Sequence, residues 1–190
     1  MINQDTKLKG SFKAILRSVF DIGGTVLISV AAVVVIRTYI IQPFLVSGSS
    51  MEPTFQDGNY LLIDEVSYHF RDPKRGEVVV FRYPGNPKTF YVKRVIGLPG
   101  ETIEIKSNQV SIEKDGEAIV LGEKYASTQE TDGDFVSTLG EDEYFMLGYN
   151  RNFSFDSRRW GPLKRSAIIG VVRLRLWPIN EVMAFGRPNY

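Results

Sequence analysis

The feature that most constrains this chain is one uncharged, apolar stretch near its N-terminus. Residues 22–36 read IGGTVLISVAAVVVI and contain no charged side chain. Apolar neighbours extend the stretch on both sides to Val19–Ile41, and a bilayer span takes roughly 17–25 such residues. Arg37 lies inside this range, but a long basic side chain near the end of a span can reach the membrane surface with its charge. We therefore predict a single transmembrane helix over residues 19–41.

The distribution of basic residues predicts the orientation of this helix. Between Arg37 and Arg71 there is no lysine or arginine. Basic residues instead gather just before the apolar stretch, at Lys7, Lys9, Lys13 and Arg17. Cytoplasmic flanks of membrane spans are enriched in Lys and Arg. We therefore expect residues 1–18 to form a cytoplasmic tail, residues 19–41 a transmembrane anchor, and residues 42–190 an extracytoplasmic domain at the cell membrane.

Two other interpretations of the apolar stretch are open. One is a helix buried in a soluble core, which the basic flank disfavours. The other is a cleaved signal peptide with small residues, Ser47 and Ser49, at its cleavage site. Arg37 and a long gap separate these serines from the apolar stretch, which is atypical of such a signal. A retained anchor is the favoured interpretation.

From residue 42 onward the pattern is that of an antiparallel β domain. Short runs rich in β-branched and aromatic residues alternate with turn-forming pairs such as Asp57-Gly58 and Asp115-Gly116. Residues 113–142 are polar and uneven and are expected to form a surface excursion. The fold class predicted is mainly β, an antiparallel β-sheet domain behind one N-terminal transmembrane helix. The predicted strands are Tyr60–Ile63, Glu77–Tyr83, Thr89–Ile96, Thr102–Ile105, Gln109–Ile112, Tyr144–Leu147 and Ile168–Leu176.

The composition excludes several kinds of active site. The chain has no cysteine and a single histidine, His69. These counts exclude disulfides, thiol nucleophiles and zinc sites built from several Cys or His ligands. A net charge of +1 gives no sign of nucleic-acid binding. A serine protease that uses a catalytic histidine would have to use His69.

Two segments contain residues that could serve as a nucleophile and a base. Residues 46–55, VSGSSMEPTF, place three serines in a turn-prone loop, although a simple hinge would have the same composition. Residues 90–101, FYVKRVIGLPGE, place two cations, Lys93 and Arg94, in an apolar strand. A lysine in a strand often protects a sheet edge. In apolar surroundings, however, its pKa falls, and a neutral lysine can accept a proton from a serine hydroxyl.

A third segment, residues 148–161, reads GYNRNFSFDSRRWG and is dense in hydrogen-bonding side chains. Together these segments resemble bacterial type I signal peptidases, membrane enzymes that remove signal peptides from exported proteins. The matching blocks are residues 50–54, 75–81, 91–100 and 148–158, in this order behind one anchor. The resemblance covers nearly the whole chain, from Arg37 to about Arg173. It implies a membrane-bound serine endopeptidase that needs no metal or organic cofactor.

The resemblance assigns catalytic roles residue by residue. It implies that Ser50 is the nucleophile, that Lys93 is the general base, and that Ser154 hydrogen-bonds to Lys93 and orients it. Many family members have a serine that helps to bind the oxyanion where this chain has Gly48. We therefore expect backbone donors, chiefly the Ser50 N–H, to stabilise the oxyanion here.

The resemblance also assigns structural and substrate-binding roles. Asp156 is expected to pair with Arg94 and Arg158 and so to brace the strand that carries the base. Tyr149 and Asn152 replace acidic residues of the usual family sequence, so those acidic roles do not carry over. The implied pocket is narrow and apolar and suits side chains the size of alanine. Its expected lining residues are Phe44, Val46, Met51, Phe55, Leu61 and Val92.

The partners that the resemblance implies are the signal peptides of exported preproteins and the lipid bilayer, and not nucleic acid. Two other functions are open. One is a different Ser-Lys peptidase, such as a soluble relative of self-cleaving repressors, which the anchor disfavours. The other is a non-catalytic, membrane-tethered domain that binds peptides, which the presence of both Ser50 and Lys93 disfavours.

Overall fold

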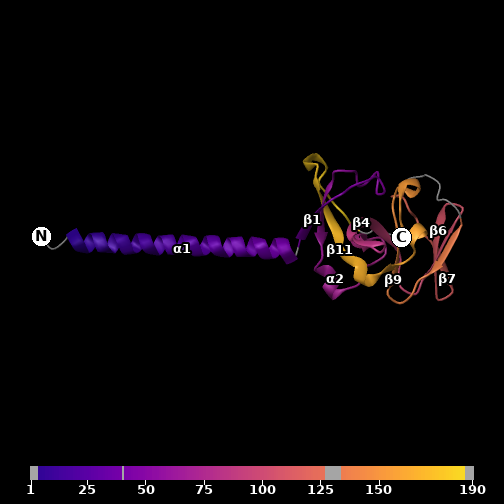
Figure 1. The fold of residues 1–190 in the computed structure, drawn as a ribbon, viewed down its shortest axis with the longest axis horizontal. Helices are drawn as coiled ribbons and strands as arrows, with labels where there is room; N and C mark the ends of the chain where they lie inside the picture. Colours follow the sequence, from indigo (N-terminus) through magenta and orange to yellow (C-terminus); the bar gives the residue numbers. More distant parts are fainter. Residues whose placement is uncertain (1–3, 40, 127–133, 187–190) are drawn as a thin grey trace. The chain divides into compact units, whose positions relative to one another are not determined.

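The structure is a computed structural model that describes residues 4–39, 41–126 and 134–186. The chain divides into two units, Met1–Ile40 and Ile41–Tyr190. The first unit is a single helix, α1 (Gln4–Tyr39), which appears as one long rod in Figure 1. Its most apolar window, Arg17–Val34, is fully exposed and is long and apolar enough to cross a membrane.

The helix begins well before the predicted span because the preceding residues also favour helix. Residues 4–18, QDTKLKGSFKAILRS, contain several lysines, leucines and other good helix formers. Residues 1–3 of the predicted tail and residue 40 of the predicted span lie outside the described residues.

The second unit is built on an antiparallel sheet with the strand order β1-β2-β11-β3-β4-β9-β10, in which β12 also pairs with β11. Alternate side chains of β3 enter different cores: Val78 and Val80 pack on one face of the sheet, and Val79 and Phe81 pack on the other. At β3 the sheet is therefore buried on both faces. Its strands are β1 (Ile41–Leu45), β2 (Tyr60–Asp64), β3 (Val78–Tyr83), β4 (Asn86–Gly97), β9 (Glu143–Leu147), β10 (Leu163–Lys164), β11 (Ile168–Trp177) and β12 (Met183–Ala184).

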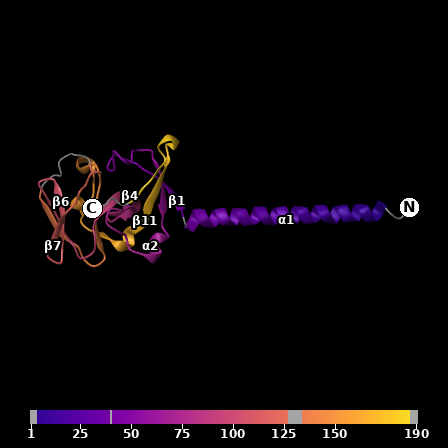
Figure 2. The same cartoon turned by 180° about the vertical axis from the view of Figure 1, so that it is seen from behind.

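A second, four-stranded sheet packs against the β4 and β9 end of the first sheet. It has the order β7-β6-β5-β8, and Figures 1 and 2 show β6 and β7 at one end of the domain. Its core joins strand residues of both sheets, such as Ile96 from β4 and Ile103 from β5. The strands are β5 (Thr102–Lys106), β6 (Gln109–Lys114), β7 (Glu117–Val120) and β8 (Phe135–Thr138).

The surface excursion expected over residues 113–142 is wrong for much of that range. The range supplies β7, β8 and the end of β6, and Leu121 and Leu139 are buried in the core between the two sheets. Its polar residues are the solvent side of short edge strands, which look irregular in sequence. Residues 127–133 lie outside the described residues.

Each of the seven predicted strands is present, within a few residues at either end, and the predicted fold class is confirmed. Five strands were not predicted: β7, β8, β10 and β12, which are the four shortest, and β1, which follows the apolar helix in sequence. The remaining elements are single turns of helix that connect strands: α2 (Ser67–Phe70), η1 (Arg151–Phe153), α3 (Ser157–Trp160), η2 (Arg165–Ala167) and η3 (Ile179–Glu181).

Candidate active site

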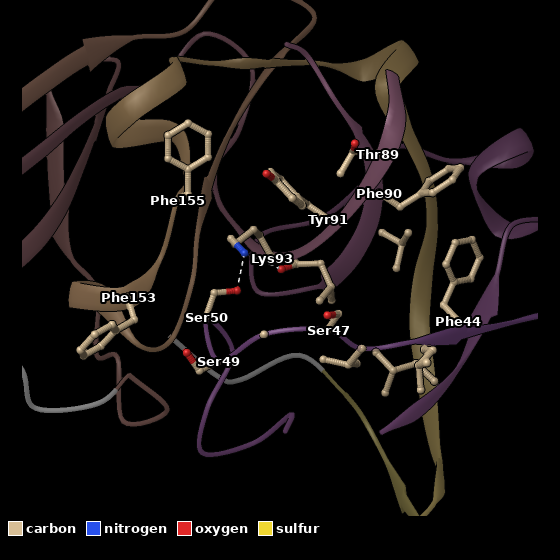
Figure 3. Close-up of a pocket in the computed structure, with 16 residues that line it drawn as sticks. Phe44, Ser47, Ser49, Ser50, Thr89, Phe90, Tyr91, Lys93, Phe153 and Phe155 are labelled. Atoms are coloured by element: carbon tan, nitrogen blue, oxygen red, sulfur yellow. Dashed lines mark hydrogen bonds between the residues drawn. The ribbon is translucent and has the colours of Figure 1, made fainter. Parts of the chain in front are cut away.

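Ser50 and Lys93 meet at the surface of the second unit. Ser50 lies in the loop between β1 and β2, and Lys93 lies in β4, 43 residues further along the chain. Their side chains are joined by a hydrogen bond of 2.5 Å between Oγ and Nζ (Figure 3). Lys93 Nζ also donates to the Val92 carbonyl oxygen at 3.1 Å. The serine and lysine that the sequence proposed as nucleophile and base are therefore in direct contact.

The surroundings of Lys93 disfavour its charged form. The residue is only 3% exposed, and Nζ lies 5.4 Å from the centre of the Tyr91 ring. None of the ion pairs among the described residues includes Lys93. Burial lowers the pKa of Lys93 from 10.5 to about 8, although the negative charge of Asp156 opposes the change. A substantial fraction of Lys93 is therefore neutral under mildly alkaline conditions.

The loop that carries Ser50 is held by the segment that follows β9. Asn150 donates its backbone N–H to the Ser50 carbonyl oxygen at 3.1 Å and its side-chain Nδ2 to the Ser49 carbonyl oxygen at 3.3 Å. A Cβ atom added to Gly148 would lie 2.5 Å from the Ser50 carbonyl oxygen, so only glycine permits this close approach. The two loops are therefore in tight contact at Ser50.

The backbone N–H of Ser50 is without a hydrogen-bond partner among the described residues. Gly48 has a φ of +96°, a conformation that favours glycine, and its N–H donates to the Asp57 side chain at 2.8 Å. A serine at position 48 would be strained in this loop, so the backbone conformation explains the departure from the more common family residue.

A groove of about 520 Å³ runs past the Ser50–Lys93 pair. In Figure 3 the pair lies between Phe153 and Phe155 on one side and Phe44 on the other. The groove therefore continues in both directions from the hydrogen-bonded pair, as an extended peptide would require.

Comparison with known proteins shows the family of this chain. The family described as "Signal peptidase, peptidase S26" matches residues 19–177. The chain is 36% identical over 171 residues to the probable signal peptidase I-2 of Synechocystis sp., a match that covers 85% of this chain and 75% of that protein. It is also 36% identical over 155 residues to signal peptidase I V of Bacillus subtilis, which covers 76% of this chain and 91% of that protein. A solved signal peptidase I of Enterococcus faecalis has 35% identity and a TM-score of 0.46, and the match covers 53% of this chain and 97% of that one.

The chain belongs to the signal peptidase, peptidase S26, family. The predicted family is thereby confirmed, and with it the predicted enzyme class, a serine endopeptidase that processes signal peptides. The single histidine of this signal peptidase, His69, is exposed on α2 and does not line the groove.

Asp156 of the signal peptidase is paired with only one of its two expected partners. Its fully buried carboxylate accepts hydrogen bonds from Arg158 Nε at 2.8 Å and Arg158 Nη2 at 3.0 Å, and from the Gly148 N–H at 3.1 Å. The Asp156–Arg158 pair is therefore present. It ties together the two ends of the loop that holds Ser50.

The predicted pairing of Asp156 with Arg94 is wrong. Arg94 donates to the Gly76 carbonyl oxygen and to the Tyr149 hydroxyl, and its guanidinium lies 4.0 Å from the centre of the Tyr125 ring. Neighbouring residues of a strand point to opposite faces, so Arg94 points away from the face that Lys93 shares with Tyr91. Tyr149, which replaces an acidic residue of the usual family sequence, accepts the Arg94 hydrogen bond through its hydroxyl instead.

The hydrogen bond expected between Ser154 and Lys93 is absent. Ser154 Oγ is buried, and the described residues provide no hydrogen-bond partner for it. It lies instead against the backbone of Gly148. Besides Ser50, the Val92 carbonyl oxygen is the hydrogen-bond partner that orients Lys93 in this structure.

Four of the six residues expected to form the pocket, Phe44, Val46, Leu61 and Val92, line the groove. The prediction is wrong for Met51 and Phe55, which are 1% and 0% exposed and belong to the core beneath the groove. In a tight turn, the side chains next to Ser50 cannot all face the substrate, and Met51 points inward.

The prediction from sequence missed several residues that line or support the site. Phe153 and Phe155 line the groove and are 69% and 48% exposed. Asn150 fixes the Ser50 loop through two hydrogen bonds. All three lie in the polar segment 148–161. The aromatic residues on either side of Ser154 were the signal in the sequence for Phe153 and Phe155, and no comparable signal in the sequence pointed to Asn150.

Proposed function

We propose that this signal peptidase cleaves preproteins with Ser50 as the nucleophile and Lys93 as the general base. The observation that carries the proposal is the 2.5 Å contact between the Ser50 hydroxyl and a buried Lys93 amine that has no carboxylate partner among the described residues. A lysine amine near its ordinary pKa is protonated at neutral pH and cannot act as a base. Burial lowers the pKa of Lys93 to about 8, which makes the neutral amine accessible.

The reaction then follows from the arrangement of these groups. Neutral Lys93 accepts the Ser50 hydroxyl proton while Ser50 Oγ attacks the scissile carbonyl carbon, and the carbonyl oxygen becomes an oxyanion near the Ser50 N–H. Protonated Lys93 gives its proton to the leaving amine, which leaves an acyl ester on Ser50. Water, deprotonated by Lys93, hydrolyses that ester and restores the serine.

The edge of β4 offers a place for an extended substrate. β9 pairs with β4 only from Arg94 to Gly97, whereas Thr89, Phe90, Tyr91 and Val92 line the groove before that point. A peptide that adds a strand here would pass Lys93 and place its small side chains beside Val46 and Leu61. We assign this edge to the cleavage region of the signal peptide.

We also propose that α1 is a single membrane span with its N-terminus in the cytoplasm and the peptidase unit outside. The window Arg17–Val34 is about 27 Å long at 1.5 Å per residue, close to the thickness of a bilayer core. Lys7, Lys9 and Lys13 precede the window and Arg17 begins it, whereas Arg37 is the one lysine or arginine between the window and Arg71, an asymmetry that fits the positive-inside rule. A reporter enzyme that is active only outside the cytoplasm should be active when fused after residue 190. An inactive fusion of normal abundance would reverse the orientation.

The test of the dyad is cleavage of a preprotein by purified variants. Ser50→Ala and Lys93→Ala should each lower kcat/KM at least about a thousandfold. The melting temperature of each variant should stay above the assay temperature, so that the loss is not due to unfolding. Ser49→Ala is the matched control, since it removes a neighbouring hydroxyl, and it should retain activity. Loss of activity in Ser49→Ala together with normal turnover in Ser50→Ala would move the nucleophile to Ser49. Tight binding of the preprotein without any cleavage by the unaltered chain would favour a peptide-binding domain.

A further inference from the structure

The segment Leu121–Ala126, which we call the brace, leaves the four-stranded sheet directly after β7 and reaches the active site. Leu121 anchors its start, because this side chain is buried between the two sheets and its N–H donates to the Val110 carbonyl oxygen at 2.8 Å. We infer that Glu123 and Tyr125 in the brace are positioning residues that hold the Ser50 loop and the Lys93 strand at their working distance. The inference rests on the Ser50–Lys93 dyad proposed above.

Glu123 holds the loop after β9 through an ion pair with Arg151. The Arg151 Nη2 and Glu123 Oε1 atoms are 2.6 Å apart, and the two side chains are only 3% and 10% exposed. Arg151 is fixed at two further points: its Nε donates to the Gly148 carbonyl oxygen at 3.0 Å, and its own carbonyl accepts from Arg158 Nη2 at 2.6 Å. Without Glu123, the buried positive charge of Arg151 would have no carboxylate partner among its described contacts.

The position of Arg151 sets the position of Ser50 through a single intervening residue. Asn150 precedes Arg151 and makes the two hydrogen bonds that fix the Ser49 and Ser50 carbonyls. Because a Cβ atom on Gly148 would overlap the Ser50 carbonyl oxygen, the two loops have no spare room between them. A shift of Arg151 would therefore be passed to the nucleophile.

Tyr125 connects the same brace to the strand of the base. Its ring lies 4.0 Å from the Arg94 guanidinium carbon and 5.1 Å from the Tyr149 ring, and its hydroxyl donates to Glu123 Oε1 at 3.0 Å. Arg94 is the residue next to Lys93. Glu123 and Tyr125 therefore support, from one short segment, the two elements that carry Ser50 and Lys93.

The Ser50 and Lys93 side chains are joined to each other by one hydrogen bond, between Ser50 Oγ and Lys93 Nζ. Their separation therefore depends on the elements that carry them, and the brace supports both of these elements. Displacement of about 1 Å at a reacting group can cost a hundredfold in rate, even when the change occurs far from the chemistry. A purely structural contact would instead change the fraction of folded protein and leave the turnover of each folded molecule unchanged. The two roles therefore predict different results for kcat.

The experiment compares Glu123→Gln with Glu101→Gln in the full chain in detergent, with a short peptide that carries a signal-peptide cleavage region. Glu101 is the matched control, because it makes an ion pair of the same length, 2.6 Å, with Arg75 and does not line the groove. At a temperature where circular dichroism shows both variants folded, Glu123→Gln should lower kcat at least tenfold and leave KM within twofold. Glu101→Gln should keep kcat within twofold, although its melting temperature falls.

Several outcomes would overturn the inference. A folded Glu123→Gln variant with kcat within twofold of the unaltered chain would do so, as would equal losses in kcat for both variants. If Glu123→Gln does not fold, Tyr125→Leu is the second variant, because it keeps an apolar side chain against Arg94 and Tyr149. It should lower kcat at least threefold. An unchanged kcat would refute the positioning role of the brace. Ser50→Ala is measured alongside. Activity in Ser50→Ala overturns the dyad, whereas an inactive Ser50→Ala beside a fully active Glu123→Gln overturns the brace alone.

Discussion

The two faces of β4 each bury a positively charged side chain, and they do so in opposite ways. Lys93 and Arg94 are adjacent in sequence and only 3% and 6% exposed. Lys93 contacts one hydroxyl, one carbonyl and one ring, with no carboxylate partner among the described residues. Arg94 donates to two oxygen acceptors and stacks against two tyrosine rings.

The difference shows that burial alone does not make a catalytic base. A lysine responds to burial with a lower pKa, whereas a guanidinium remains charged in proteins. The fall in the pKa of Lys93 from 10.5 to about 8 costs the folded state about 3 kcal/mol. That cost is fully present below pH 8 and disappears as the pH rises towards 10.5, because the unfolded chain binds the extra proton. The proposed base therefore lies on the face of β4 where the environment destabilises the charge.

The largest effect is expected when the Lys93 face of β4 is given a permanent charge, as the Arg94 face already has. Lys93→Arg should lower kcat/KM by about a thousandfold or more, because a guanidinium cannot accept the Ser50 proton. Turnover of a preprotein by the purified variant is the measurement. Lys114→Arg, at an exposed position on β6, is the control and should be unaffected. More than a tenth of the original activity in Lys93→Arg would contradict the role of Lys93 as base.

Removing the charge of Asp156 should change both stability and the Lys93 face. Asp156→Asn should lower the free energy of unfolding by about 3–5 kcal/mol, since Arg158 would lose its buried carboxylate partner. Because the Asp156 charge raises the pKa of Lys93, its loss should move the acidic limb of the pH–rate profile to lower pH. Urea unfolding and a pH series of kcat/KM measure the two effects. Full stability with lost activity would instead give Asp156 a direct part in the chemistry.

The pH dependence of the unaltered enzyme tests the Lys93 face directly. With the pKa of Lys93 lowered to about 8, kcat/KM should rise about a hundredfold from pH 6 to a plateau above pH 9, as one proton is lost. An unperturbed histidine would give a limb near 6.5 instead. His69→Gln separates the two sources and should leave the profile unchanged. Disappearance of the limb in His69→Gln would replace the Ser-Lys mechanism by one with a histidine base.

The smallest expected effect concerns the Arg94 face. Arg94→Lys should lower the free energy of unfolding by about 2 kcal/mol, because an ammonium cannot stack between two rings while it donates to two separate acceptors. The acidic limb should stay near pH 8, since Arg94 lies on the opposite face from Lys93. Urea unfolding and the pH profile check these outcomes. A shifted limb with unchanged stability would assign Arg94 to the chemistry of Lys93.

Sequence patterns predicted the strands with strong alternation or many apolar residues. They missed the strands of four residues or fewer, and also β1. Strands β3, β4 and β11 are rich in β-branched and aromatic residues, a composition that is typical of buried strands. Strands such as β7 and β8 are short, and nearly all of their side chains face solvent or are only partly buried. Their pairing depends on partners elsewhere in the chain, so a local reading of residues 113–142 could not find the second sheet.

What the sequence determined by itself was the apolar helix, the mainly β class, and the identity of the serine and lysine, because these depend on local composition and on residues that match the family. The tertiary structure decided which side chains those residues meet. It paired Asp156 with Arg158 alone, placed Arg94 between Tyr125 and Tyr149, left Ser154 without a partner among the described residues, and directed Met51 and Phe55 into the core. The contacts of Arg94 with Tyr125 and Tyr149 join segments tens of residues apart, so no local pattern in the sequence predicts them. The Asp156–Arg158 pair is local, but packing and backbone conformation decide that Arg94 does not join it.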